Sequence, residues 1–188
     1  MAMPARATEW TVDVLDALPD DGNRYELIDG ELFVTPAPSD VHQLIAGELN
    51  SRLLHYLRAS SVGRSIMSPA DVRKPDRKRN RVQPDVFVVR LTDGKRPTYP
   101  FDLRDLLLAV EVQSPSNPAY DYQVKRELYL NNGVPEYWIV NADSRNVARW
   151  RGTADPGEIL SMRLEWQPRG MSTAFVLELA EFFETALS

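Results

Sequence analysis

The apolar segment from Leu106 to Gln113 is the feature that most constrains the fold, because it carries a carboxylate inside a run typical of a core strand. Its period-two alternation places Leu108, Val110 and Val112 on one face, and Glu111 and Gln113 on the other. Burying a carboxylate costs free energy unless a cation or hydrogen-bond donors compensate for the lost water. A strand of this kind therefore predicts compensating partners around Glu111.

A second acid, Asp85, opens the apolar strand Val86-Phe87-Val88-Val89 directly after Pro84. Two acids that end or interrupt neighbouring core strands can meet at one edge of a sheet. There they would form the oxygen-rich site that Mg²⁺ prefers. The alternative is that Asp85 is a turn residue and Glu111 pairs with an arginine, and the residue pattern alone does not separate the two.

A predicted helix downstream adds a third group. Asp121, Lys125 and Tyr129 are spaced four apart and so share one helical face. Lys125 could point towards the two acids, where a cation can stabilise a phosphate under attack. The alternative is a surface Asp121–Lys125 pair, and the spacing by itself favours this alternative.

Composition narrows the class of protein. The 188 residues include no cysteine and two histidines, which excludes a disulfide framework, a thiolate nucleophile and a thiolate zinc site. No apolar run approaches the roughly 20 residues needed to cross a bilayer, and the first residues lack the apolar core of a secretory signal. We therefore expect one soluble, cytoplasmic domain over residues 1–188, without membrane contact.

The order of the expected elements indicates a mixed α/β domain. An N-terminal helix over Trp10–Leu18 precedes a hairpin centred on Asp29-Gly30, and Ser39 is placed to cap a helix that reaches about Arg58. Strands are expected over residues 63–74, 82–89, 106–113, 136–140, 147–150 and 161–166. Further helices are expected from Asn117-Pro118 to Asn132 and over 177–187.

Several of these segments, in this order, resemble the Uma2 family of restriction-endonuclease-like proteins, which has the PD-(D/E)XK nuclease fold. The resemblance spans roughly Trp10 to Glu184, and its most specific part runs from Asp85 to Val140. The segments that carry it are Tyr25-Glu26-Leu27-Ile28-Asp29-Gly30-Glu31-Leu32, Pro38 and His42, Pro84-Asp85, Glu111-Val112-Gln113-Ser114-Pro115-Ser116, Asp121 with Lys125 and Tyr129, and Gly133-Val134-Pro135-Glu136-Tyr137-Trp138-Ile139-Val140.

The resemblance implies a mixed central sheet flanked by helices, with Asp85 and Glu111 as the metal-binding acids. The nuclease pattern has a lysine two residues after the second acid, where this chain has Gln113. The family resemblance maps that lysine onto Lys125, whose long stem can reach the same space from a helix. Gln113 could still hold the attacking water, but it cannot supply a positive charge.

Other residues have two interpretations each. Glu48 could bring a helix acid to the metal, although a solvated or Arg52-paired Glu48 is the favoured interpretation. For His42 a structural hydrogen bond is favoured over metal ligation. The basic stretch from Arg73 to Arg81 could contact a nucleic-acid backbone, although the net charge of the chain is −5.

The resulting hypothesis is a Mg²⁺-dependent endonuclease, with Mn²⁺ as a substitute, that hydrolyses DNA phosphodiester bonds. Asp85, Glu111 and a backbone carbonyl near Val112 or Gln113 would hold the ion, and a homodimer is plausible for cutting two strands. One alternative is an inactive nuclease-fold module that binds DNA or protein. A further alternative is a metal-dependent phosphoesterase that acts on RNA or nucleotides.

Overall fold

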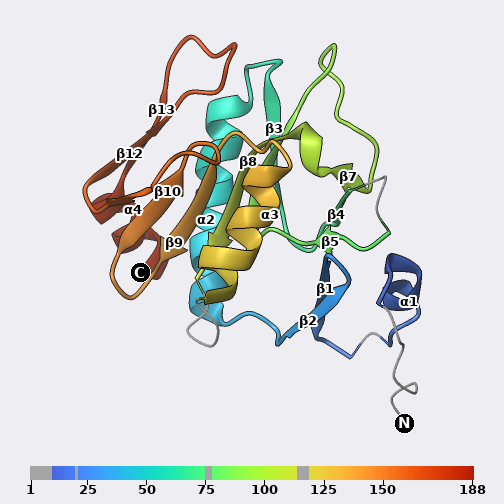
Figure 1. The fold of residues 1–188 in the computed structure, drawn as a ribbon. Coiled ribbons are helices and arrows are strands. Elements are labelled where there is room, and N and C mark those ends of the chain that lie inside the picture. Colours follow the sequence, from blue (N-terminus) through green and yellow to red (C-terminus); the bar gives the residue numbers. More distant parts are fainter. Residues whose placement is uncertain (1–9, 20, 75–77, 114–118) are drawn as a thin grey trace.

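The computed structural model describes residues 10–19, 21–74, 78–113 and 119–188 (Figure 1). Its centre is a six-stranded sheet in the order β11-β10-β9-β8-β6-β3, in which β8 and β9 are parallel and the other neighbours are antiparallel. The strands are β3 (Gly63–Met67), β6 (Val86–Arg90), β8 (Leu106–Val112), β9 (Tyr137–Asn141), β10 (Asn146–Trp150) and β11 (Glu158–Leu160).

Strand β8 lies inside this sheet, and all seven of its residues are buried. A parallel β8–β9 pair requires a crossover, which is supplied by the π-helix η2 (Tyr120–Lys125) and the helix α3 (Arg126–Asn131). This crossover packs on one face of the sheet. The helices α2 (Asp40–Leu57) and α4 (Leu179–Leu187) pack on the other face, so that helices cover both faces (Figure 1).

A second, five-stranded sheet in the order β2-β1-β5-β4-β7 lies beside the first. It contains the hairpin of β1 and β2, and the short helix α1 packs against Leu27 of β1. The bounds are α1 (Val12–Asp16), β1 (Arg24–Ile28), β2 (Glu31–Thr35), β4 (Val72–Arg73), β5 (Arg81–Val82) and β7 (Phe101–Asp102), which the 3₁₀ helix η1 (Leu103–Asp105) follows. The strands β12 (Arg163–Trp166) and β13 (Phe175–Glu178) form a separate antiparallel pair.

The structure confirms the turn and the helix cap that were predicted from local sequence signals. Asp29 and Gly30 have φ values of 49° and 88°, as the turn of the predicted hairpin requires. The side chain of Ser39 accepts a hydrogen bond from the backbone N–H of His42 and so caps α2. The mixed architecture of sheets and helices is also as expected.

Several predicted elements have different bounds. The strand predicted over 82–89 is interrupted at Pro84-Asp85, because Val82 belongs to the second sheet and Val86 to the first. The strand predicted over 63–74 is likewise divided between β3 and β4. The last helix begins at Leu179 instead of residue 177, because Phe175–Glu178 pairs with β12. The predicted cap at Asn117-Pro118 lies outside the described residues.

Candidate functional site

Asp85 lies where the chain passes from the second sheet into the first, and its place there brings it beside Glu111. The antiparallel register of β6 and β8 pairs Val86 with Val110, so the residue before Val86 faces the residue after Val110. One carboxylate oxygen of Asp85 also accepts a hydrogen bond from the Val112 backbone N–H at 2.8 Å. The two predicted acids therefore lie opposite each other, Asp85 just before β6 and Glu111 in β8, at the same end of these neighbouring strands.

The carboxylate of Asp85 is buried but well compensated. Its Oδ1 contacts Arg24 Nη1 at 2.8 Å and its Oδ2 contacts His42 Nε2 at 2.9 Å. Burial by itself would raise the pKa of Asp85, but the hydrogen bond with His42 and the charges of His42 and Arg24 hold that pKa well below its usual value. Asp85 is therefore ionised.

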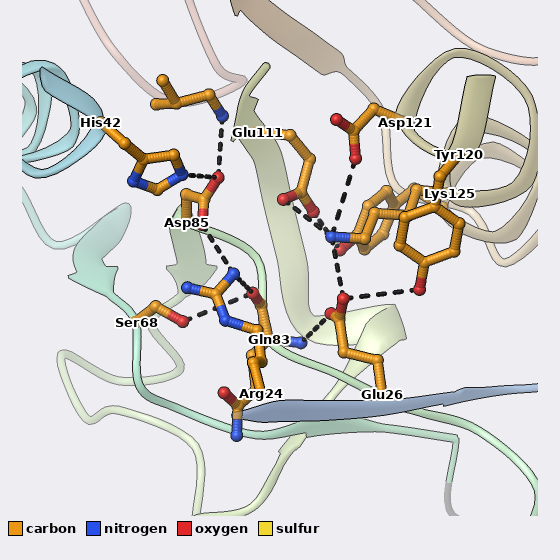
Figure 2. Close-up of polar contacts among 12 residues, drawn as sticks. Arg24, Glu26, His42, Ser68, Gln83, Asp85, Glu111, Tyr120, Asp121 and Lys125 are labelled. Carbon is orange, nitrogen blue, oxygen red and sulfur yellow. Dashed lines mark hydrogen bonds and ion pairs between the residues drawn. The ribbon is translucent and has the colours of Figure 1, made fainter. Parts of the chain in front are cut away.

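Glu111 has two partners from the crossover helices, and Figure 2 shows one of them, Lys125, beside its carboxylate. Its Oε1 accepts a hydrogen bond from the Tyr129 hydroxyl at 2.9 Å, and its Oε2 lies 3.0 Å from Lys125 Nζ. Burial raises the pKa of Glu111 well above its ordinary value, because Lys125 only partly offsets the lost hydration and the nearby Asp85 and Asp121 charges add to the effect. A further cation at this carboxylate would favour its ionised form.

Lys125 is buried at the centre of the site. Its Nζ lies 3.1 Å from Glu26 Oε2 and 3.8 Å from Asp121 Oδ1, and 5.0 Å from the centre of the Tyr120 ring. Burial would lower the pKa of Lys125, but attraction to Glu111 and Glu26 raises it well above the usual value. The surface Asp121–Lys125 pair that the spacing favoured is thus wrong, because both side chains are buried.

The π-helical turn explains why Lys125 has two neighbours from its own element. In a π-helix the hydrogen bond closes between residues five apart, so the turn is wider than in an α-helix. Tyr120 and Asp121 precede Lys125 by five and four residues, and both contact its ammonium group. The wider turn accordingly lets one helix place both a carboxylate and an aromatic ring beside the same lysine.

A small cavity of about 110 Å³ is lined by the groups that could take part in chemistry, which include Asp85, Glu111, Val112, Asp121 and Lys125. Its acidic side chains offer only oxygen donors, which suit a hard divalent ion. Four carboxylates, those of Glu26, Asp85, Glu111 and Asp121, surround the two permanent cations Arg24 and Lys125. The ionised cluster would carry excess negative charge, which a divalent ion would neutralise.

The charged side chains of this cluster are paired with one another and do not form a preorganised metal-binding site. Within the described ranges, no three histidine, aspartate or glutamate side chains form a group that could hold a metal ion. Magnesium commonly takes one or two protein carboxylates and completes its shell with water and substrate phosphate. Asp85 and Glu111 fit that requirement.

The remaining predicted residues lie near the cluster or away from it. Gln113 accepts a hydrogen bond from Asn141 Nδ2 at 2.6 Å and lines a wider pocket next to the cavity. Glu48 pairs with Arg52 at 2.6 Å and is not among the residues that line either space. His42 makes the structural hydrogen bond that was expected, and its partner is the carboxylate of Asp85.

Two contributors were not predicted from the sequence. Arg24 and Glu26 reach the cluster from β1 of the second sheet, and Glu26 also accepts a hydrogen bond from the backbone N–H of Gln83 at 2.8 Å. The available signal was Glu26 between Tyr25 and Leu27, an acid inside an apolar strand like Glu111. Its target could not be found because the contact joins β1 to Lys125 in the crossover, which follows much later in the chain.

The basic stretch from Arg73 to Arg81 differs from the expectation. Arg73 pairs with Asp71 at 3.0 Å, Lys78 pairs with Asp13 at 3.0 Å, and Arg81 pairs with Asp16. Residues 75–77 lie outside the described part of the chain. The charges of these three described side chains are thus offset by neighbouring acids, which weakens the case for a phosphate-binding loop.

Comparison with solved structures shows that another protein has the fold described above. A crystal structure of "a putative nuclease belonging to DUF820" from Anabaena variabilis ATCC 29413 superposes with a TM-score of 0.76 at 17% sequence identity. The match covers 94% of this chain and 98% of that chain. A comparison with curated protein sequences finds no match.

The family assignment comes from the sequence itself. Residues 12–180 match the Uma2 family, which is described as "Putative restriction endonuclease". The match includes every residue of the cluster, from Arg24 to Tyr129. The chain therefore belongs to the Uma2 family of restriction-endonuclease-like nucleases.

Proposed function

We propose that this protein is a divalent-metal-dependent endonuclease that hydrolyses phosphodiester bonds in DNA. The observation that carries the proposal is the shared cavity of Asp85, Glu111 and Lys125, two acids from adjacent strands with a buried ammonium group beside them. Membership in a nuclease family supports phosphodiester chemistry at this cavity.

Asp85 and Glu111, with the backbone carbonyl of Val112, would hold Mg²⁺ or Mn²⁺. When bound, such an ion supplies a Lewis acid for the phosphate and lowers the pKa of a coordinated water. Asp85 is ionised, as a metal ligand must be, because its pKa is well below the usual value. It would give up part of its contacts with Arg24 and His42 when it binds the ion. Glu111 would give up part of its contact with Lys125 when it turns towards the ion.

Lys125 acts as a charged hydrogen-bond donor. Its raised pKa keeps the ammonium group protonated at neutral pH, so it cannot serve as the general base. An ammonium group in this position can orient the attacking water or stabilise negative charge that develops on the phosphate. Gln113, as a neutral amide, can help to hold the water but cannot replace this charge.

Glu26 and Tyr129 position the reacting groups without touching the substrate. Glu26 does not line the cavity, and it holds Lys125 from the side of the second sheet. Tyr129 fixes one oxygen of Glu111 and leaves the other towards Lys125. These contacts hold the functional side chains in place before a substrate arrives.

A second candidate function is an inactive nuclease-fold module that binds DNA. The observation in its favour is that Asp85 already has three partners, Arg24, His42 and the Val112 N–H, so the cluster can stabilise the fold without an ion. Salt-dependent DNA binding without metal-dependent cleavage would support this candidate.

The test is cleavage of circular single-stranded and supercoiled double-stranded DNA with Mg²⁺ or Mn²⁺, since circular substrates have no ends and report only endonuclease activity. Asp85→Asn and Glu111→Gln should each reduce the rate by about 100-fold or more, because even groups that only orient metal ligands cost 10–100-fold. Glu48→Gln is the matched control, since this carboxylate is paired with Arg52 away from the cavity.

Thermal unfolding of each variant separates lost activity from lost folding. If Asp85→Asn and Glu111→Gln are folded and cleave DNA at the wild-type rate, this cavity is not the catalytic site. Equal cleavage of RNA circles would move the substrate class from DNA to nucleic acids in general.

We further propose that the protein forms a homodimer in order to cut both strands of a duplex, and light scattering can measure this oligomeric state.

A further inference from the structure

A second pocket of about 450 Å³ lies next to the acid-lined cavity. The two spaces share part of their lining, namely Arg24, Thr35, Pro36, His42 and Val112. The second pocket lies between the segment that joins β2 to α2 and the ends of β8 and β9. The two spaces therefore adjoin, and a ligand too large for the cavity can extend from it into this pocket.

The walls of the pocket differ in chemistry from the cavity. Pro36, Ala37, Pro38, Val41 and Ala142 supply apolar surface, and Gln113 and Asn141 supply amides. Its volume falls in the range of roughly 300–1,000 Å³ that is typical of small-molecule sites. A space that combines apolar walls with hydrogen-bonding side chains suits a flat heterocycle that has hydrogen-bonding edges.

The hydrogen bonds fix the orientation of the amides. Asn141 Oδ1 accepts from the backbone N–H of Ser144 at 2.8 Å, so its Nδ2 faces Gln113 and donates to Gln113 Oε1 at 2.6 Å. The amide nitrogen of Gln113 must then point away from Asn141, and it donates to no other residue in the described part of the chain. Gln113 thus offers N–H donors to a ligand.

The charged residues that line the two spaces indicate which part of a ligand each space can accept. Asp40 and Asp143 line the second pocket and disfavour a phosphate there, whereas Arg24 and His42 lie where the two spaces meet. A phosphate at that boundary and a neutral base in the pocket match this distribution. Carboxylates and amides are also the groups that commonly read the edges of bases.

We propose that this pocket binds the base and sugar of one unpaired nucleotide that adjoins the scissile phosphate. The proposal rests on the proposed function and deepens it by naming the substrate class. A base inside a duplex is stacked and cannot enter a protein pocket unless it is extruded. The substrate is therefore single-stranded DNA, or duplex DNA with an extruded or frayed nucleotide at the cleavage point.

The test is binding of a labelled single-stranded oligonucleotide and of the matching blunt duplex, measured by fluorescence anisotropy in EDTA. We expect at least about tenfold tighter binding of the single strand. Val41→Trp, which fills the pocket, should remove about tenfold of that affinity. Val176→Trp is the matched control, because Val41 and Val176 are 40% and 41% exposed and Val176 lies outside the pocket.

Equal affinity for the two forms, no binding of either form, or equal effects of Val41→Trp and Val176→Trp would overturn the proposal. Its failure is distinguishable from failure of the proposed function. Metal-dependent cleavage without a preference for single strands would contradict only the proposal of a nucleotide pocket. A preference for single strands that depends on Val41, without cleavage under any metal, would contradict only the proposal of a hydrolase.

Asn141→Asp tests the role of the amide pair. An aspartate cannot donate to Gln113 Oε1, so the Gln113 amide should turn over and present its oxygen to the pocket. The order of affinity for single-stranded homopolymers of dA, dC and dT should then change. An order that matches the wild type would contradict base reading by Gln113.

Discussion

Asp121 is the acid of the cluster whose pKa is displaced into the range of ordinary buffers. Burial raises the pKa of Asp121 to about 6 from 3.8, although Lys125 opposes the change. The folded protein consequently binds a proton at Asp121 more tightly than the unfolded chain does. This part of the stability is complete below about pH 4 and is lost as the pH rises through about 6.

Asp121→Asn should therefore change how stability depends on pH. Between about pH 4 and pH 7 the wild type should lose on the order of 2 kcal/mol relative to the variant, because asparagine has no proton to lose. Urea unfolding at several pH values measures the difference. Parallel stability curves for the two proteins would show that Asp121 has an ordinary pKa.

Lys125 compensates several buried carboxylates at once, so its removal should be costly. Lys125→Met should reduce the free energy of unfolding by about 3–5 kcal/mol in EDTA, because it leaves Glu26 and Glu111 buried without their cation. Mg²⁺ should restore part of this loss by taking the place of the ammonium charge. Cleavage should not return with the stability.

Lys78→Met is the control for Lys125→Met. Lys78 pairs with Asp13 at 3.0 Å, but its side chain is 75% exposed, and exposed pairs contribute about 0–1 kcal/mol. Similar losses in the two variants would contradict the central place of Lys125 in the cluster.

Among the elements, the turn between β10 and β11 packs against Trp150, the last residue of β10. Trp150 stacks on Tyr137, and the Tyr137 hydroxyl donates to the Asp121 carbonyl at 3.0 Å. A Cβ at Gly157 would lie 2.2 Å from Trp150 Nε1, whereas a Cβ at Gly152 would meet nothing within 4 Å. The two glycines have similar φ values of 86° and 82°.

Gly157→Ala should thus destabilise the protein more than Gly152→Ala. Both variants carry the cost of an alanine at positive φ, and Gly157→Ala adds about 1–3 kcal/mol because the rigid indole must move. Thermal or urea unfolding of the pair isolates the contact with Trp150. Equal destabilisation would show that the turn does not press on the indole.

The elements that the sequence predicted are those determined by local chemistry. Asp29-Gly30 and Ser39 act within their own turn or cap, and the apolar run up to Val112 identifies a buried strand wherever it is placed. The π-helical turn and the β12–β13 pair were not predicted. The first holds Lys125, whose partner Glu26 lies in another element, and the second requires pairing between Arg163–Trp166 and Phe175–Glu178.

In the site, too, the residues that could be predicted were those marked by local patterns or by the family resemblance. Asp85, Glu111 and Lys125 could be selected because each interrupts a pattern or matches the family in order. Glu26 and Arg24 could not be assigned, because their partners, Lys125 in the crossover and Asp85 just before β6, meet β1 only in the folded molecule. The predicted Glu48 was selected from its place on a helix, and its partner is Arg52 on the same helix.

At the scale of the whole molecule, the crossover, the central sheet and the N-terminal hairpin all meet at the cluster (Figure 2). An ion held there would bind the folded chain and not the unfolded one, so it should stabilise the fold by mass action. We expect Mg²⁺ to raise the melting temperature of the wild type. The increase should be smaller in Asp85→Asn and Glu111→Gln, and unaltered in Glu48→Gln.

The most direct measurement is anomalous diffraction from crystals soaked in Mn²⁺. We predict one strong peak between Asp85 and Glu111, roughly 2 Å from an oxygen of each, with Lys125 beside it. No peak between these acids at saturating Mn²⁺, or a peak only at other carboxylates, would contradict the account.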